Sequence, residues 1–235
     1  MGQEYRALFG TTALGYRRQY LHHYGHVLRK GGEKISFARC NQMIADAAYL
    51  RSRRADVTYV MIEPNPNLFA RPIYREADIA LCIALSDNPN AASLMKLYFA
   101  NKDRTGQGSS LFEAKPNVSL DDYTTVINVN ASHFARMIKD AYEAEHGTDY
   151  CVILRLNNEG AEVEVIKSFE ATFGPRLEGV LGSLADVAKV HGQPELNAIY
   201  DFMKSKGIPF IPLYSAFTSW PDAIAFVRGK VEGTL

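Results

Sequence analysis

The sequence predicts an α/β protein with a doubly wound, mainly parallel sheet and helices on both faces. The clearest indication is the segment 150–169, in which an apolar run at 151–154 is followed by a polar turn and then by apolar residues at helical spacing. Apolar runs alternate with helical patterns along the rest of the chain, which favours a parallel sheet. The last two predicted strands, 208–214 and 223–227, are separated by a loop too short for a crossover helix, so we expect that pair to be antiparallel.

The elements follow in order from apolar runs, breaks and caps. Gly31-Gly32 precedes the first strand of the domain, Ser132 is expected to cap a helix that ends near residue 146, and Pro194 and Gly207 begin and end another helix. The predicted strands are 35–37, 57–62, 79–85, 93–100, 126–129, 151–154, 177–184, 208–214 and 223–227, and the predicted helices are 41–50, a short piece at 68–69, 132–146, 161–169 and 194–206. Residues 101–120 are polar and rich in Gly and Ser, which is typical of a functional loop.

Two segments are assigned by their position. Residues 1–32 are interpreted as an N-terminal helical arm of one or two short helices, and 33–235 as the α/β domain. The arm has a basic, histidine-rich face (Arg17, Arg18, His22, His23 and His26), which fits either a solvated helix face or contact with an anionic substrate. No acidic residue or cysteine joins these histidines at helical spacing, so no metal site is expected there.

The composition is that of a soluble globular protein. Of the 235 residues, 47% are hydrophobic, and Lys plus Arg balance Asp plus Glu at 26 each, so no net charge favours nucleic acid or an anionic membrane. Cys40, Cys82 and Cys151 lie in or beside predicted strands and fit reduced thiols in a cytoplasmic protein. No apolar run approaches ~18 residues, so no membrane span is expected. The N-terminus lacks the basic-then-apolar pattern of a signal peptide.

Two polar turns follow predicted strands at the edge where open α/β sheets bind ligands. One turn contains Asn157, Asn158 and Glu159. The other begins with Glu63, and an acidic side chain after the second strand of a nucleotide-binding sheet holds the ribose hydroxyls. Pro64 and Pro66 stiffen that turn. The alternative for Glu63 is a carboxylate that interacts with the dipole of the next helix.

Several segments resemble the FkbM-type methyltransferases in order and spacing, over roughly residues 33–230. They are EPNPNLF at 63–69, ALSDN at 84–88, GQGSSLF at 106–112, LRLNNEGAEVEVI at 154–166 and LEGVLGSLADVAK at 177–189. The resemblance implies a Rossmann-like sheet of about seven strands. It also implies S-adenosylmethionine as cofactor and methyl transfer to a hydroxyl of a sugar or other small metabolite.

The resemblance also implies roles for individual residues. Those expected at the cofactor are Asn41, Glu63, Asn65, Ala84 and Leu85, and those expected beside the reacting groups are Asn157, Glu159 and Glu162. Glu159 is the first candidate for the general base, with capping of the following helix as its alternative. Glu162 is either functional or a partner of the helix dipole. Asn157 is expected to orient a ligand, and His133, a second candidate base, is interpreted as a surface histidine.

The acceptor is expected to be a small molecule or carbohydrate. No nucleic-acid partner is expected, and the possibility of a homo-oligomer is left open.

Two further segments are candidates for contact with the acceptor. Ser109 and Ser110 lie in a glycine-containing stretch that is typical of a lid, and the pattern of a phosphate-binding P-loop is absent. Trp220, with Phe217 and Tyr214, is interpreted either as a stacking platform for a sugar ring or as packing at the edge of the core.

One segment departs from the family pattern. The cofactor loop of the family reads Asp-x-Gly-x-Asn-x-Gly, whereas 37–43 reads FARCNQM, in which only Asn41 matches. Arg39 and Met43 would project bulk toward the cofactor, since glycines there allow close approach of the backbone. Two functions therefore remain: a methyltransferase with a rebuilt cofactor loop, or a catalytically inactive relative that binds a partner.

Overall fold

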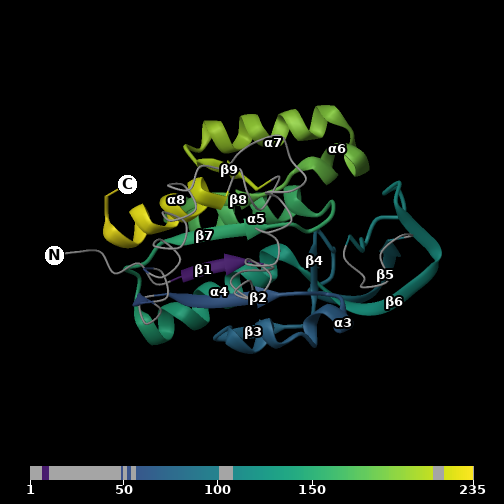
Figure 1. Cartoon of the computed structure of the whole chain (residues 1–235), viewed down its shortest axis with the longest axis horizontal. Coiled ribbons are helices and arrows are strands. Elements are labelled where there is room, and N and C mark those ends of the chain that lie inside the picture. Colours follow the sequence, from purple (N-terminus) through teal and green to yellow (C-terminus); the bar gives the residue numbers. More distant parts are fainter. Residues whose placement is uncertain are drawn as a thin grey trace, which may run out of the picture.

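The larger sheet of the protein is parallel throughout its described strands. The computed structural model (Figure 1) describes residues 7–10, 49, 52–53, 57–100, 108–213 and 220–234. Within these residues the larger sheet has six strands in the order β3-β2-β1-β7-β8-β9. They are β1 (Ala7–Gly10), β2 (Thr58–Ile62), β3 (Ile79–Leu81), β7 (Val152–Leu156), β8 (Leu177–Gly182) and β9 (Phe210–Pro212). The fold is a mixed α/β fold, as predicted.

The central strand β1 comes from the predicted N-terminal arm. It pairs in parallel with β2 on one side and with β7 on the other. The expectation of helix is therefore wrong for Ala7–Gly10. Four residues are too short to show a period, and both partner strands lie far along the chain, so no local pattern reveals the pairing. The remainder of the arm, the predicted strand 35–37 and nearly all of the helix 41–50 lie outside the described residues, and the boundary at residue 32 stays a prediction.

The end of the chain is helical, which corrects the predicted antiparallel last pair. Strand β9 pairs in parallel with β8, and the predicted strand 223–227 lies within helix α8 (Trp220–Glu232). Ala223, Val227 and Val231 are four residues apart and bury against the sheet. This helical spacing prevails over the local strand preference of a short apolar run.

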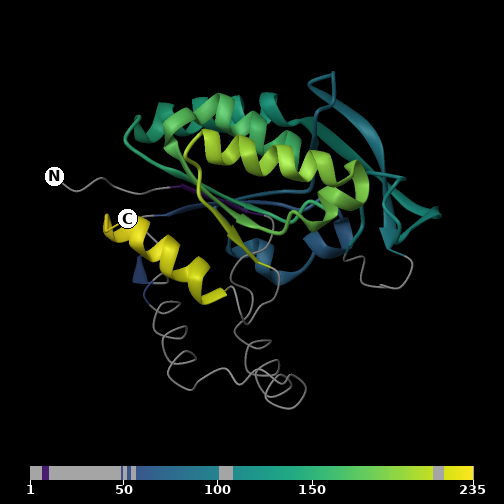
Figure 2. The same ribbon diagram turned by 90° about the horizontal axis from the view of Figure 1, so that it is seen from above.

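Helices cover both faces of the larger sheet, as the sequence predicts, and Figure 2 shows α8 on the opposite side from α4, α5 and α7. The side chains of β7 alternate between the two faces. Val152, Leu154 and Leu156 belong to the hydrophobic cluster that includes residues of α4, α5 and α7, whereas Ile153 packs against α8. The additional bounds are α4 (Ala131–His146), α5 (Glu162–Phe173), α6 (Ala185–His191) and α7 (Gln193–Ser205). None of the helices in the described part of the chain is long and apolar enough to cross a membrane.

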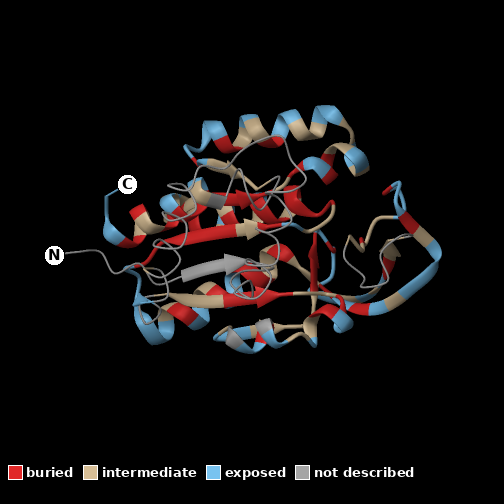
Figure 3. Cartoon of the chain, in the orientation of Figure 1, coloured by how far each residue is buried: buried red, intermediate tan, exposed pale blue. Residues whose placement is uncertain are grey.

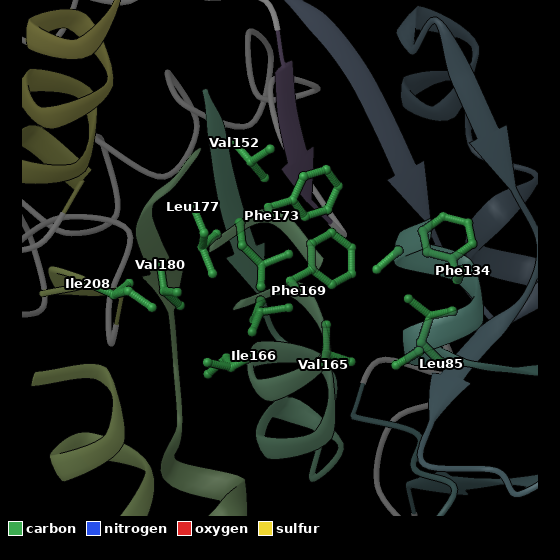
Figure 4. Close-up of a cluster of buried hydrophobic side chains, with 14 of the residues drawn as sticks. Leu85, Phe134, Val152, Val165, Ile166, Phe169, Phe173, Leu177, Val180 and Ile208 are labelled. Atoms are coloured by element: carbon green, nitrogen blue, oxygen red, sulfur yellow. The ribbon is translucent and has the colours of Figure 1, made fainter. Parts of the chain in front are cut away.

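The core on the first face is continuous from the sheet into helices α4 and α5. Phe169 and Phe173 of α5 lie between Val152 of β7 and Phe134 of α4 (Figure 4). Buried positions concentrate in this region, whereas the outer faces of the helices and much of β5 and β6 are exposed (Figure 3). The segment 161–169, predicted as a helix, is confirmed as the start of α5.

A second, three-stranded sheet adjoins the first. Its order is β4-β6-β5, with β4 (Ala84–Ser86) parallel and β5 (Ala92–Ala100) antiparallel to β6 (Val118–Asn130). The predicted strand 79–85 therefore divides between two sheets. The predicted extra strand 93–100 is confirmed, and 126–129 is the end of a longer strand.

Short helical elements follow β2 and precede β3. They are α3 (Pro66–Phe69), as predicted, and a 3₁₀ helix, η2 (Pro72–Glu76). The predicted cap of α4 is wrong by two residues: Asn130 Oδ1 accepts a hydrogen bond from the His133 amide at 2.8 Å. Asn and Ser cap helices equally well, and the end of β6 decides which one is used.

The strand order reverses at the centre of the larger sheet. Counted in chain order within this sheet, the strands run 3-2-1-4-5-6, so the direction of winding reverses between β1 and β7. Ligands of open α/β sheets bind at the carboxyl ends of the strands beside such a reversal. The turns after β2 and β7 lie at this edge.

Candidate active site at the carboxyl edge of the sheet

Glu63 is the first residue after β2, and the surrounding structure holds its carboxylate in place. Its amide donates to the Leu81 carbonyl at 3.1 Å. Its Oε1 accepts from the Asn65 amide at 2.8 Å, and its Oε2 accepts from the Tyr74 hydroxyl at 3.0 Å. Burial raises the pKa of Glu63, although the bonds from Asn65 and Tyr74 oppose that change. The result is a partly desolvated, oriented carboxylate.

The other residues expected at the cofactor have structural contacts. Asn65 is buried and caps α3, with its Oδ1 accepting from the Asn67 amide at 2.9 Å. The side chains of Ala84 and Leu85 are buried in hydrophobic clusters on the second sheet and the main core. Their expected place beside adenine stays a prediction, and Asn41 lies outside the described residues.

The turn after β7 has a backbone conformation that is rare for residues other than glycine. Glu159 has φ 57° and Gly160 has φ 123°. The fully buried Glu162 supports this turn: its Oε1 accepts from the Asn158 amide at 2.8 Å and its Oε2 from the Gly160 amide at 2.9 Å. Glu162 thus bonds to the backbone of the turn, while Asn157, which begins it, is exposed.

Packing from two sides also holds the turn. A Cβ added to Gly160 would lie 2.9 Å from side-chain atoms of both Phe112 and Val190, so only glycine fits without displacement. His191 Nε2 lies 2.8 Å from the Gly160 carbonyl oxygen, and its ring meets that of Phe112 edge-on, with centroids 5.1 Å apart. The backbone of Glu159 is therefore held independently of its side chain.

The carboxylate of Glu159 lies in a charged cluster that the sequence did not reveal. Lys115 Nζ contacts Glu159 Oε2 and lies 3.8 Å from Asp186 Oδ1, and Lys189 Nζ lies 2.8 Å from the same Asp186 oxygen. Burial raises the pKa of Glu159; Lys115 acts against this, and Asp186 adds to it. Lys115 stands in a polar stretch without periodicity, so no sequence signal distinguishes it from an exposed lysine.

The described end of the predicted lid is attached to this turn. Ser110 is buried, its Oγ donates to the Glu159 carbonyl at 2.7 Å, and its backbone amide and carbonyl both pair with Tyr98. Ser109 is half-buried beside it. Contact of either serine with an acceptor stays a prediction. Trp220 is the first residue of α8, and its side chain, with Phe217 and Tyr214, lies outside the described residues.

Glu63 and Glu159 lie at the same edge of the sheet, on either side of the end of β1. Both follow strands that pair with β1. The two carboxylates are close enough for the negative charge of Glu159 to raise the pKa of Glu63. The structure therefore brings together two of the sequence-predicted residues and adds Tyr74, Lys115 and Asp186 around them.

Glu162 is expected to make the protein less stable as the pH rises through the weakly acidic range. Burial raises the pKa of its carboxyl from 4.5 to about 7. Between these values the folded state binds more protons than the unfolded state, so the free energy of unfolding decreases as the pH increases. In urea unfolding measured at several pH values in this range, the free energy of unfolding of Glu162→Gln should decrease less steeply with pH than that of the unmodified protein. Glu145→Gln, at a side chain that is 78% exposed, is the control and should retain the original slope. If the stability of Glu162→Gln had the same pH dependence as that of the unmodified protein, the raised pKa of Glu162 would be contradicted.

Comparison with known proteins places the chain in a family. A family model described as the methyltransferase FkbM domain matches residues 31–207, about three quarters of the chain. The match includes both carboxylate turns and begins after β1. Neither a comparison with curated proteins nor one with solved structures gave a match. The extent of the family match confirms the resemblance seen in the sequence, and the chain belongs to the FkbM methyltransferase family.

Proposed function

We propose that this protein is an S-adenosylmethionine-dependent methyltransferase that methylates a hydroxyl of a sugar or other small metabolite. The observation that carries the proposal is the position of Glu63 and Glu159, whose carboxylates lie at one edge of the sheet on either side of β1. The family match supports a methyltransferase. The cofactor and the acceptor class are the parts that we propose.

A Rossmann-like architecture supports the nucleoside part of the proposal. The strand order 3-2-1-4-5-6 is that of sheets that bind nucleotides at the point where the order reverses. Glu63 follows the second strand of this sheet, the position whose carboxylate holds ribose hydroxyls. Each of its carboxylate oxygens accepts one protein hydrogen bond and retains a lone pair for a ribose hydroxyl. The residues present therefore fit the group.

The end of the central strand also supports a ligand site at this edge. The strand between β2 and β7 is β1, and the chain leaves its carboxyl end at Gly10. A glycine at that point lets the backbone approach a ligand closely. Segment 37–43 lies outside the described residues, and the family match is what favours an enzyme over an inactive binding protein.

The chemistry at the site requires orientation and a base. S-adenosylmethionine, when bound, supplies the methyl group. Glu63 would hold the nucleoside, and the residues at this edge of the sheet would bring the acceptor oxygen within ~3–3.5 Å of the methyl carbon. A hydroxyl is a poor nucleophile, so the Glu159 carboxylate would accept its proton as the new bond to carbon forms. Its partial desolvation raises its pKa toward the range that suits a base.

Replacing Glu63 with Ala should abolish S-adenosylmethionine binding, because the ribose would lose its carboxylate partner. Calorimetry should show a Kd on the order of micromolar for the unmodified protein and no detectable binding to Glu63→Ala. Glu145→Ala, at an exposed site, is the control and should bind normally. Unchanged affinity in Glu63→Ala would refute the ribose assignment. Absence of binding to the unmodified protein would instead favour an inactive relative.

A further inference from the structure

Lys115 is a buried lysine that the proposed chemistry does not itself use. It lies between the Gly108 turn and β6, and its side chain is only 1% exposed. An ammonium group removed from water is costly unless all its protons are bonded. Its surroundings indicate what compensates for this cost.

The ammonium of Lys115 has three oxygen neighbours from three separate parts of the chain. It donates to the Gly108 carbonyl at 2.9 Å, it contacts Glu159 Oε2, and Asp186 Oδ1 lies 3.8 Å away. These groups belong to the turn before β6, the turn after β7 and the first turn of α6. One cation thus connects the segment before β6 to the turn after β7 and to the start of α6.

The charged groups around Glu159 are not equivalent. Lys115 is buried and touches Glu159 directly, whereas Lys189 is 53% exposed and forms its ion pair with Asp186. Asp186 and Glu63 are the neighbouring anions, and both act electrostatically with Glu159. With three carboxylates gathered here, Lys115 is the cation that compensates Glu159 at short range among the described residues.

We propose that Lys115 is a positioning residue for the Glu159 carboxylate: it joins the Gly108 turn, the Glu159 turn and Asp186 into one unit and directs that carboxylate toward the edge where Glu63 lies. Glu159 has a left-handed backbone, so its side chain leaves the turn in an unusual direction. The Lys115 contact then determines where the carboxylate points. The catalytic meaning of this positioning rests on the proposed function, but the contact itself does not.

The test is a titration of the Glu159 carboxyl that needs neither cofactor nor acceptor. Protein labelled with ¹³C in glutamate side chains is titrated by NMR, and Glu159→Gln identifies the Glu159 signal. The variant is Lys115→Met, which keeps the length of the side chain and removes its charge. The matched control is Lys189→Met, which removes the exposed cation of the same cluster.

Lys115→Met is expected to raise the measured pKa of Glu159 by about 1 to 3, because an opposite charge in contact is lost while the carboxylate stays desolvated. Lys189→Met should change it by less than roughly 0.5, as expected for an exposed ion pair. If Lys115 only filled space or closed the loop, its removal would admit water and the pKa of Glu159 would fall or stay the same. Either of those results would overturn the proposal.

A variant that removes both charges covers the case in which Lys115→Met does not fold. Lys115→Met/Glu159→Gln leaves no unpaired charge between the two turns, and it should fold and unfold cooperatively in urea. If this double variant also fails to fold, the contact with Gly108 is the main role of Lys115 and the proposal is wrong. If S-adenosylmethionine does not bind while the Glu159 titration behaves as expected, the proposed function fails and the positioning role of Lys115 stands.

Discussion

Replacing Glu159 with Gln is expected to slow methyl transfer by roughly 10²–10⁴-fold, the contribution typical of a positioned general base. The amide has nearly the shape of the carboxylate but cannot accept the proton of the acceptor hydroxyl. The turn itself should persist, because Glu162, Ser110 and the packing around Gly160 hold its backbone. Binding of S-adenosylmethionine should therefore be unchanged.

The measurement is release of S-adenosylhomocysteine in the presence of a panel of mono- and disaccharides. Glu145→Gln is the control at an exposed site and should retain the rate of the unmodified protein. That rate should rise with pH as Glu159 loses its proton, with a midpoint above the ordinary glutamate value because burial raises its pKa. Normal turnover in Glu159→Gln would exclude this residue as the base.

Replacing Gly182 with Ala is expected to destabilise the fold by about 3 kcal/mol or more. Gly182 ends β8 and has φ 152°, in a region that is essentially restricted to glycine. An added Cβ would also collide with the backbone carbonyl of Leu156, at the end of β7. Because the obstacle is backbone, moving a side chain cannot relieve the clash, and the ends of β7 and β8 would have to separate.

Gly147→Ala is the matched control for backbone conformation without the clash. Gly147 also has a positive φ, 78°, but nothing lies within 4 Å of the position of its Cβ. With ψ −165° this backbone conformation is nearly restricted to glycine, so the replacement should cost about 1–3 kcal/mol from backbone strain alone, less than at Gly182. Comparing the urea unfolding of the two variants separates the cost of backbone strain from the cost of the clash with Leu156. Equal losses of stability would show that the close approach of β8 to Leu156 is unimportant.

The parts of the fold that were predicted correctly have their signal within one short window. The run at 151–154 and the helical spacing after Gly160 became β7 and α5, and Glu63 does follow a buried strand. Strands and helices of this kind can be recognised from their hydrophobic periodicity and from the turns that flank them. The family resemblance likewise depends on local motifs, and the match over 31–207 confirmed it.

The errors concern elements whose identity depends on distant partners. Ala7–Gly10 is a strand because β2 and β7 offer it hydrogen bonds on both sides. The run at 223–227 is helical because Ala223, Val227 and Val231 bury on one face against Ile153 and Leu181. A short apolar run is compatible with either state, and tertiary contacts select one.

The sequence by itself determined the α/β class, the two turns that carry Glu63 and Glu159, and the family, since each depends on neighbouring residues. Only the tertiary structure decided that these two carboxylates share one edge, and that Lys115 and Asp186 surround the second. A charge acts through space, so the cation compensating Glu159 comes from the residue that folding brings against it, 44 positions earlier in the chain.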